Sequence, residues 1–260
     1  MTTKGPIAGA ARETQTLCGA RAVLAALRHR PDDLERLFFA ADCAPEHSEI
    51  LRSHLRRAAA RRVPYRQAGS DELERICGSR AHQGLVAVFR APRVHLAGPT
   101  QLRSFAAQDK VWVALDCVGN PHNLGAIART AAFLGAAGLL VERGQASAHA
   151  SAAAYRTAEG ALESLPVWQV GSLAQAMGLL RVAGAEVIAL DVRDAGLLSA
   201  WVRPARGAVV LVAGAEETGI RPQVRDACTR AVRIEGTDAV ESLNVGVALA
   251  IALARSLGRS

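Results

Sequence analysis

The sequence predicts a two-domain α/β protein, and three observations lead to that prediction. The chain has 260 residues, a length that suits two domains of ordinary size. Half of the residues are hydrophobic but only 4% are aromatic, so Ala, Val and Leu must fill closely packed layers. Short apolar runs alternate with segments of helical periodicity, which is the pattern of α/β folds.

The first domain is expected over residues 15–90, because residues 1–15 are polar or small and are expected to be disordered. Helical segments are expected around Val23–Leu27 and over 48–62 and 71–77, and short strands at 37–40, 63–65 and 85–89. This alternation within about 75 residues predicts a small α/β/α sandwich.

Residues 91–108 contain Pro92, Gly98 and Pro99 without strong periodicity, so we expect a linker there. A second alternating series occupies residues 109–260. Strands are expected at 111–115, 138–141, 166–170, 186–190, 208–213 and 231–234. A final helix is expected at 244–257. Since helices separate the strands, we expect a parallel sheet covered on both faces, with ligands at the carboxyl ends of its strands.

The net positive charge of the protein lies in the first part of the chain. Residues 1–108 hold 17 of the 31 Lys and Arg and 10 of the 24 Asp and Glu, so the whole net charge of +7 lies there. Nearly all of the excess is arginine, whose planar fork suits phosphate. One domain is therefore expected to hold a polyanion while the other does chemistry, although a solvated arginine-rich surface explains the charge equally well.

Several classes of protein are excluded by what the sequence lacks. The five cysteines are widely spaced and form no C-x-x-C pair, so we expect reduced thiols in a cytoplasmic protein and no bound metal. The segment Met1–Ala11 has one Lys and no long apolar run, unlike a signal peptide. No stretch of 18 uninterrupted apolar residues occurs, so we expect no membrane partner.

Three polar clusters each follow an apolar run in the second domain. The first extends from Asn120 to Gly135, with Asn123 as a candidate helix cap and Arg129 inside the helix. The second contains Glu216 in a turn that begins at Gly214, where a ligand could approach the backbone closely. The simpler interpretation of each cluster alone is a capped helix or an ordinary turn.

The third cluster contains Ile234, Ser242, Leu243 and Asn244 and leads into an apolar helix. Ser and Asn are typical residues at a helix start, which is the simpler interpretation here too. No Lys-Ser or Lys-Thr follows the glycines of the second cluster, and no G-x-G-x-x-G follows a strand. A P-loop and a standard dinucleotide site are therefore not supported.

Taken together, the clusters resemble in order and wording the three signature motifs of the SpoU family, the RNA 2'-O-ribose methyltransferases of the SPOUT superfamily. The first family motif reads roughly D-P-x-N-x-G-x-x-x-R-T-A-x-x-x-G, and here it is Asn120-Pro121-His122-Asn123-Leu124-Gly125 through Arg129-Thr130-Ala131 to Gly135. Leu211–Ile220 and Ile234–Val247 resemble the other two. The segment Arg156–Val167 is similar to the family's stretch between the first two motifs.

The first domain resembles the family's L30e-like substrate-binding domain, through Cys18-Gly19 and Ala81-His82-Gln83-Gly84. The resemblance covers about residues 15–258. The chain departs from the family pattern at four positions, where other residues are usual: Ala215, Glu217, Glu235 and Gly246.

The resemblance implies a catalytic domain whose C-terminal part is threaded as a deep trefoil knot, a rare exception to ordinary chain topology. It implies S-adenosylmethionine as cofactor, contacted by Gly214, Ile234 and Leu243, largely through backbone groups that recognise adenine. It also implies a homodimer whose partner completes the site. A ribose 2'-hydroxyl as acceptor implies RNA rather than DNA, and the L30e-like domain favours rRNA over tRNA.

The resemblance makes Arg129 the essential residue near the 2'-hydroxyl. The family proposal treats it as a general base, which is demanding because guanidinium stays protonated in proteins. A second version has Arg129 hold a neighbouring phosphate and polarise the hydroxyl. Asn123 and Glu216 would orient Arg129 or the ribose, and Ser242 and Asn244 would fix the third loop.

Two alternatives remain at this level: a catalytically silent RNA-binding protein of the same fold, and a tRNA base methyltransferase. Arg129 and Ser242-Leu243-Asn244 favour ribose chemistry over the second. His82 and His122 could each touch RNA, although a structural role for His82 and an exposed loop position for His122 are the simpler interpretations. The sequence does not identify the RNA or the nucleotide.

Overall fold

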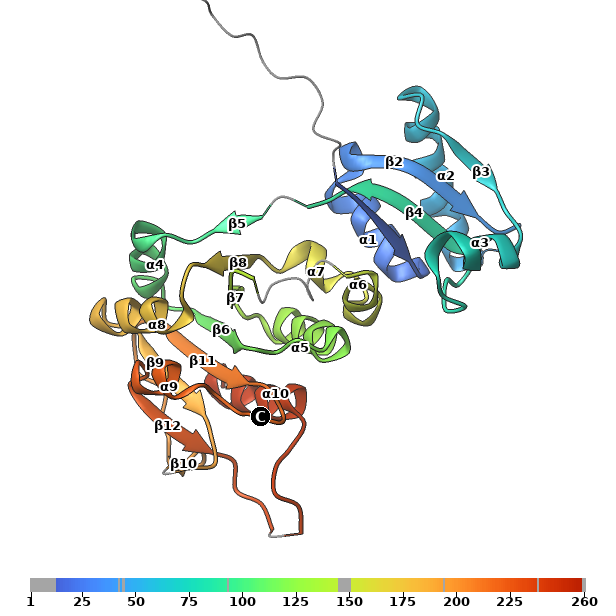
Figure 1. The fold of residues 1–260 in the computed structure, drawn as a ribbon. Coiled ribbons are helices and arrows are strands. Elements are labelled where there is room, and N and C mark those ends of the chain that lie inside the picture. Colours follow the sequence, from blue (N-terminus) through green and yellow to red (C-terminus); the bar gives the residue numbers. More distant parts are fainter. Residues whose placement is uncertain are drawn as a thin grey trace, which may run out of the picture. The chain divides into compact units, whose positions relative to one another are not determined.

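The structure is a computed structural model, and it describes residues 13–41, 43, 45–92, 94–144, 151–193, 195–237 and 239–258 (Figure 1). Its contacts divide the chain into two compact units, Met1–Arg93 and Val94–Ser260, which are described separately below.

The first unit is built on a four-stranded sheet in the order β1-β4-β2-β3. Its strands are β1 (Thr14–Cys18), β2 (Leu34–Phe39), β3 (Tyr65–Gln67) and β4 (Leu85–Arg90). Its helices are α1 (Ala20–His29), the short 3-10 helix η1 (Pro31–Asp33), α2 (Pro45–Ala60) and α3 (Ser70–Cys77). Leu17, Leu27, Leu37, Leu73 and Phe89 are fully buried between the layers. The predicted small α/β unit is confirmed.

Strand β1 was not predicted, because residues 1–15 were expected to be disordered. Thr14 and Gln15 instead pair with Arg90 and Phe89 of β4 in an antiparallel ladder. The polar run escaped detection because its buried position is held by a hydrogen bond rather than by apolar packing. The Gln15 side chain is buried, and its Oε1 accepts from Arg30 Nη2 at 2.8 Å.

The second unit is built on an eight-stranded sheet in the order β10-β12-β9-β11-β6-β7-β8-β5. Every strand pair of this sheet is parallel, so the predicted parallel sheet is confirmed. Its strands are β5 (His95–Leu96), β6 (Val111–Asp116), β7 (Leu139–Glu142), β8 (Val167–Val170), β9 (Glu186–Leu190), β10 (Gly196–Leu197), β11 (Val209–Gly214) and β12 (Arg230–Arg233).

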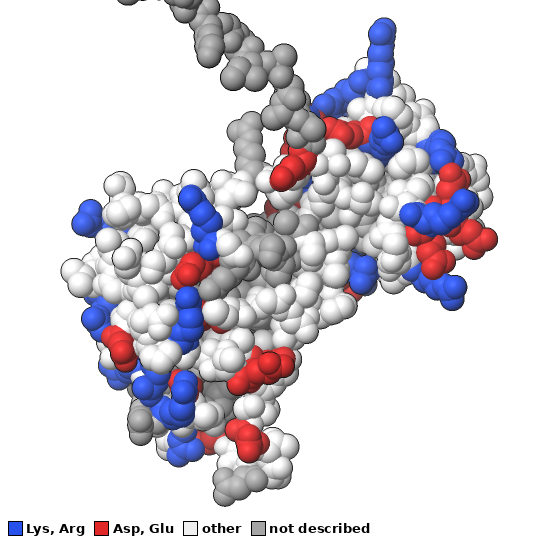
Figure 2. Space-filling view, viewed as in Figure 1, with Lys and Arg blue, Asp and Glu red and all other residues white. Residues whose placement is uncertain are grey.

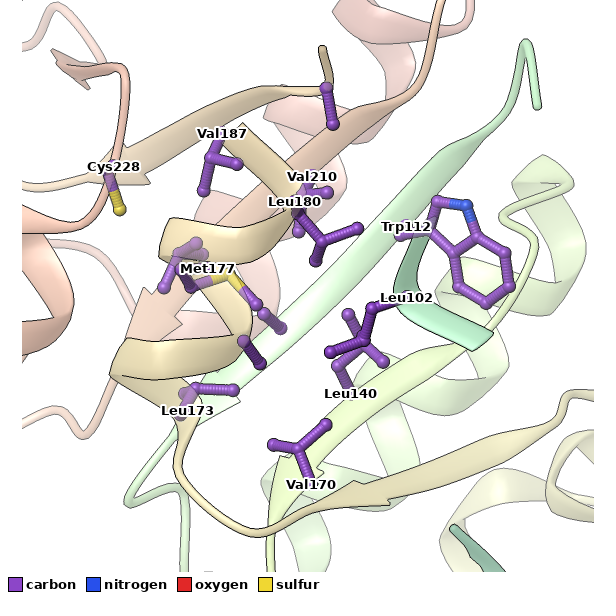
Figure 3. Close-up of a cluster of buried hydrophobic side chains, with 14 of the residues drawn as sticks. Leu102, Trp112, Leu140, Val170, Leu173, Met177, Leu180, Val187, Val210 and Cys228 are labelled. Atoms are coloured by element: carbon purple, nitrogen blue, oxygen red, sulfur yellow. The ribbon is translucent and has the colours of Figure 1, made fainter. Parts of the chain in front are cut away.

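Helices cover both faces of this sheet. They are α4 (Pro99–Ala106), α5 (Pro121–Leu134), α6 (Ala152–Ala158), α7 (Ala161–Ser164), α8 (Leu173–Val182), α9 (Pro222–Asp226) and α10 (Val245–Ser256). On one face, Met177 and Leu180 of α8 pack over Val210 and Leu140 (Figure 3). Successive strand residues point to opposite faces, so Leu211 points away from this cluster toward the face where α10 contacts β11.

Residues 91–108 were expected to be a linker, and the structure differs there. They contain β5, which pairs with β8, and α4, whose Leu102 and Phe105 are buried in the core of the second unit. The Phe105 ring stacks on Trp112 with 4.0 Å between centroids. Helix α4 has only two turns, and Pro and Gly surround them, so its helical periodicity was not visible in the sequence. Pro99 itself suits the first position of a helix.

No helix in the described part of the chain is long and apolar enough to cross a bilayer. The trefoil knot implied by the family resemblance stays a prediction.

Candidate active site

The carboxyl ends of β6, β11 and β12 bring the three polar clusters to one edge of the sheet. β11 pairs in parallel with β6, with Gly214 opposite Asp116, so the loops after these strands leave side by side. β12 runs parallel to β9, which in turn pairs with β11. Loops at this edge of a parallel sheet are where ligands bind.

Asn244 connects all three clusters. Its Nδ2 donates a hydrogen bond to Asn123 Oδ1 at 3.1 Å and a second, short one to Glu216 Oε1. These partners lie 121 and 28 residues away along the chain. The structure therefore brings three of the predicted site residues into direct contact.

Asn244 is also the N-cap of α10, as its residue type suggested. Its Oδ1 accepts from the backbone N–H of Gly246 at 2.9 Å and of Val247 at 3.3 Å. Because both oxygen and nitrogen are engaged, the orientation of the amide is fixed by its surroundings. One side chain thus caps a helix with its oxygen and joins two loops with its nitrogen.

Asn123 does not cap α5, and that prediction was wrong. The N-cap is Asn120, whose Oδ1 accepts from His122 N at 2.9 Å, and Pro121 occupies the first helical position. Proline is favoured at that position because its missing N–H has no partner to lose there. Asn123 consequently lies inside the first turn, where its side chain is available to Asn244.

Arg129 lies six residues further along α5 than Asn123, about 9 Å along the helix axis. Its Nη2 pairs with Glu159 Oε2 at 3.1 Å, and the Arg129 side chain is 54% exposed. Within the described part of the chain, no hydrogen bond or ion pair joins it to Asn123, Glu216 or Asn244. The structure places Arg129 on the same helix as the site without direct contact to the Asn244 cluster.

Glu159 reaches Arg129 from the end of α6. It has φ 48°, in the left-handed region that is uncommon for a residue other than Gly, Asn or Asp. Helices α5 and α6 can approach closely because position 125 is a glycine: a Cβ there would lie 2.6 Å from Ala154 O. The glycine of the first motif therefore brings the end of α6 within reach of Arg129.

The second motif forms a tight turn that presents Glu216 to solvent. Ala215 and Gly219 form an antiparallel bridge, with Gly219 N donating to Ala215 O at 2.8 Å. A Cβ at Gly214 would lie 2.1 Å from the carbonyl carbon of Gly219, a distance that backbone atoms cannot accommodate. The glycine requirement at position 214 is set by the turn itself.

A partly buried ionic network behind this turn was missed by the sequence reasoning. Asp116 is fully buried; its Oδ2 accepts from Arg221 N and its Oδ1 from Arg221 Nε, both at 2.7 Å. Arg221 Nη2 also donates to Glu142 Oε2 at 2.8 Å, and this oxygen accepts from Leu173 N at 2.7 Å. A carboxylate as the last residue of a buried strand was the available signal.

Charge pairing in this network shifts two pKa values. The hydrogen bond from Arg221 is the largest influence on Glu142 and lowers the pKa of that carboxyl, against a smaller opposing effect of burial. The hydrogen bond to Glu142, which is the largest influence, and the hydrogen bond to Asp116 both raise the pKa of the Arg221 guanidinium. Arg221 follows the second motif directly, so the network anchors the turn that carries Glu216 to the ends of β6 and β7.

The residues predicted to contact the cofactor lie at the same edge of the sheet. Gly214 ends β11, and Ile234 follows β12 and is half-buried. Leu243 is 43% exposed, and Ser242 is exposed without a hydrogen bond to another described residue. Two accessible apolar side chains beside backbone edges suit an adenine ring, so the residues present fit S-adenosylmethionine.

Two of the four departures from the family pattern, at Glu235 and Gly246, have local explanations. Glu235 accepts a hydrogen bond from Ser199 Oγ, which is the largest of the influences that lower the pKa of its carboxyl. A Cβ at Gly246 would lie 3.1 Å from Asn244 Oδ1, so glycine relieves crowding around the cap. Ala215 takes part in the bridge of the turn, and Glu217 is exposed at its tip.

Two histidines considered for RNA contact have internal partners. His82 is buried; its Nδ1 accepts from Gly84 N at 3.0 Å and its Nε2 lies 3.2 Å from Ser70 Oγ. Both ring nitrogens are used, which supports the structural role. His122 is exposed, with Nδ1 3.2 Å from Thr157 Oγ1. Among the described residues, no group of three or more His, Cys, Asp or Glu is placed to hold a metal ion.

Two family models match the chain. Residues 110–254 match the SpoU rRNA Methylase family, and residues 16–95 match the RNA 2'-O ribose methyltransferase substrate binding family. A 23S rRNA (guanosine-2'-O-)-methyltransferase RlmB from Burkholderia sp is 37% identical over 238 residues, or 91% of this chain and 93% of the relative. The RlmB of Bordetella pertussis is 34% identical over 94% of this chain and 97% of the relative.

Solved structures show the same fold at lower identity. An AdoMet-bound rRNA methyltransferase from Sinorhizobium meliloti is 23% identical, with a TM-score of 0.76 over 94% of this chain and 86% of that one. The SpoU methyltransferase AviRb from Streptomyces viridochromogenes, in complex with AdoMet, is 23% identical, with a TM-score of 0.74 over 95% and 90%.

Proposed function

The chain belongs to the SpoU rRNA methylase family, and from that premise we propose that it methylates the 2'-hydroxyl of a ribose in ribosomal RNA. It is a methyltransferase that uses S-adenosylmethionine. The observation that carries the proposal is the pair of hydrogen bonds by which Asn244 joins Asn123 and Glu216. Contact among three loops is what a site assembled from three motifs requires.

Gly214, Ile234 and Leu243 hold the cofactor in this proposal, through the backbone at the strand ends and the two apolar side chains. When bound, S-adenosylmethionine supplies an electrophilic methyl group on its sulfonium. The protein's task is then to position the ribose oxygen in line with that methyl group and to assist the departure of the hydroxyl proton.

Arg129 acts as an orienting cation. Guanidinium groups remain protonated in proteins. A charged Arg129 can hold a phosphate next to the target ribose with its remaining N–H groups and polarise the 2'-hydroxyl. The hydroxyl proton then leaves to solvent or to a phosphate oxygen, as the oxygen gains the methyl group.

We assign Asn123 and Glu216 to contacts with the ribose, and we assign Asn244, which is hydrogen-bonded to both, to fixing their separation. Ser242 is an exposed hydroxyl on the third loop that can contact the substrate or the cofactor. We assign RNA binding to the domain of residues 15–90 and catalysis to residues 109–260.

We further propose that the enzyme is a homodimer. Val247 and Ile251 of α10 are 48% and 40% exposed, and Phe133 of the contacting helix α5 is 85% exposed. Large exposed apolar side chains on two neighbouring helices of a monomer support association through those helices. The cytoplasm is the compartment we propose, because ribosomal RNA is there and we expect the five cysteines to be reduced thiols.

The relatives named for guanosine methylation in 23S rRNA make a guanosine of that RNA the substrate we propose. The test compares 2'-O-methylation across rRNA and tRNA from cells with and without the gene. One site in 23S rRNA should lose its methyl group. Loss of a tRNA base methyl instead would favour base chemistry, and an unchanged map would favour a silent RNA-binding protein.

A further inference from the structure

Helix α2 and the residues after it carry a dense series of arginines: Arg52, Arg56, Arg57, Arg61 and Arg62, all of them exposed. Two of these share a single carboxylate. Arg57 Nη2 and Arg61 Nη1 lie 3.2 and 3.0 Å from the same oxygen of Asp32. Arginine side chains can be followed over the end of the unit where α2 meets β3 (Figure 2). Positive charge at this end of the unit therefore exceeds the carboxylate that neutralises it.

Arg52 and Arg56 have no such neutralisation. They are four residues apart on α2, so they lie on one face about one turn from each other. Among the described residues, neither forms a hydrogen bond or an ion pair with a carboxylate. Two guanidinium groups that point into solvent with free planar forks can each take a phosphate through two N–H bonds.

Arg28, near the end of α1, adds positive charge beside α2. Helices α1 and α2 are in contact, and His54 of α2 is close to both Arg28 and Arg57. Burial is the largest cause that lowers the pKa of His54, and the charges of these two arginines lower it further. The local potential is positive enough to disfavour another cation, which is the field that attracts a polyanion.

Arg66 and Arg80, elsewhere on this unit, are paired with acids of their own. Arg66 forms an ion pair with Glu72, and Arg80 Nε lies 3.1 Å from Glu74 Oε1. Arg28, Arg52 and Arg56 lie on two contacting helices and, among the described residues, have no carboxylate partner. We call this set the α1–α2 arginine face.

We propose that the α1–α2 arginine face binds the phosphodiester backbone of the substrate RNA. This inference rests on the proposed function, and it specifies which surface of the first domain holds the RNA. Helix α2 contains no Phe, Tyr or Trp on which a base could stack. Contacts of this kind fix the position of the RNA and carry no sequence information.

The test uses the full chain with Arg28, Arg52 and Arg56 all changed to alanine. Its matched control changes the paired arginines Arg66 and Arg80 to alanine, and a Lys triple variant keeps the charge of the face. RNA dissociation constants are measured over a range of KCl concentrations for an rRNA fragment that the wild type methylates. The dissociation constant for S-adenosylmethionine and kcat at saturating RNA are measured in parallel.

The alanine triple variant should bind RNA at least tenfold more weakly at physiological salt. The slope of log K against log salt should fall by about 0.7 to 0.9 for each phosphate that the face no longer neutralises. The Lys variant should recover most of this slope, while cofactor affinity and kcat stay near those of the wild type. RNA affinity equal to that of the Arg66 and Arg80 control, or a lower kcat with unchanged RNA affinity, would overturn the proposal.

The two proposals fail in different ways. If the wild type binds RNA through this face without methylating it, the assignment of the face stands and the proposed reaction is wrong. If the triple variant methylates RNA with an unchanged KM, the reaction stands and this surface is not where the RNA is held.

Discussion

Arg129 Nη2 and Glu159 Oε2 lie 3.1 Å apart, which joins the helix of the first motif to the end of α6. Glu159, which carries this carboxylate, has φ 48°, and the next residue, Gly160, has φ 97°. Backbone strain of this kind, of order 1–3 kcal/mol, is commonly kept at functional sites. We infer that Glu159 is a positioning residue for Arg129.

Glu159→Gly separates the positioning role from stability. Relief of the left-handed strain should offset the loss of a largely exposed ion pair, so the free energy of unfolding should change by less than about 1 kcal/mol. Single-turnover methyl transfer should nevertheless slow by about tenfold, because the Glu159 carboxylate no longer positions the Arg129 side chain. A variant that is as fast as the wild type would show that the ion pair has no part in the reaction.

Arg129→Ala should abolish methyl transfer while the dissociation constant of S-adenosylmethionine changes by less than about twofold. The reason is that, among the described residues, no hydrogen bond or ion pair joins Arg129 to the predicted cofactor residues. Calorimetry and a tritium-transfer assay measure the two quantities on one preparation. Retained turnover would contradict the assigned role, and it would also remove the reason for the Glu159 prediction.

The two capping asparagines provide a matched pair of substitutions. Asn244→Asp keeps the oxygen that caps α10 but replaces the Nδ2 donor with a charge beside Glu216. Asn120→Asp keeps the only interaction that Asn120 makes through its side chain among the described residues, which is acceptance from His122 N. Activity should fall at least tenfold in the first variant and little in the second.

Both variants should retain their helices, because Asp and Asn cap equally well. Adding Glu216→Gln to the Asn244→Asp variant removes the like charge and restores a donor, so part of the activity should return. Equal activity in the two single variants would mean that the link to Asn123 and Glu216 is incidental.

Gly214→Ala and Gly236→Ala test the cofactor loops in the same way. A Cβ at position 214 meets the backbone of Gly219 and Ile220 within 2.4 Å, whereas nothing lies within 4 Å of a Cβ at position 236. The first variant should lose about 1–3 kcal/mol of stability through overpacking and bind S-adenosylmethionine at least tenfold more weakly. The second should resemble the wild type in thermal unfolding and in calorimetry.

Acid sensitivity follows from the network behind the second motif. The pKa of Glu142 is lowered from its ordinary value of 4.5 in the folded protein, so its contribution to stability is present above about pH 4.5 and is lost as pH falls through the lowered pKa. Glu142→Gln should cost about 1–3 kcal/mol at neutral pH and flatten the decline below pH 4.5. Urea unfolding from pH 3 to 7 measures this, with the exposed Glu217→Gln as control.

Residue patterns predicted the parts of this protein in which apolar spacing is long or regular. The strands at 138–141, 186–190 and 208–213 appear within one residue of β7, β9 and β11, and the final helix at 244–257 appears as Val245–Ser256. Asn244 was predicted to start that helix and does so with two hydrogen bonds. In these segments, local propensity and tertiary packing agree.

The failures came where a tertiary contact decides the role of a residue. Asn123 and Asn120 are equivalent as local capping signals, and Pro121 determines which of them is used. β1 pairs with β4 and is bonded through Gln15 to Arg30, and α4 packs through Phe105 on Trp112; none of these tertiary contacts leaves a local periodicity. The pairing of Arg129 with Glu159 likewise joins residues 30 positions apart and could not be read from either motif.

The most direct test of the account supplies purified protein with isotope-labelled S-adenosylmethionine and a 23S rRNA transcript, and then identifies the labelled nucleoside by mass spectrometry. We predict a single nucleoside, guanosine, with the labelled methyl group on the ribose 2'-oxygen, and no product when the target ribose is replaced by 2'-deoxyribose. A label on a base, or labelling that persists on the 2'-deoxy substrate, would contradict it.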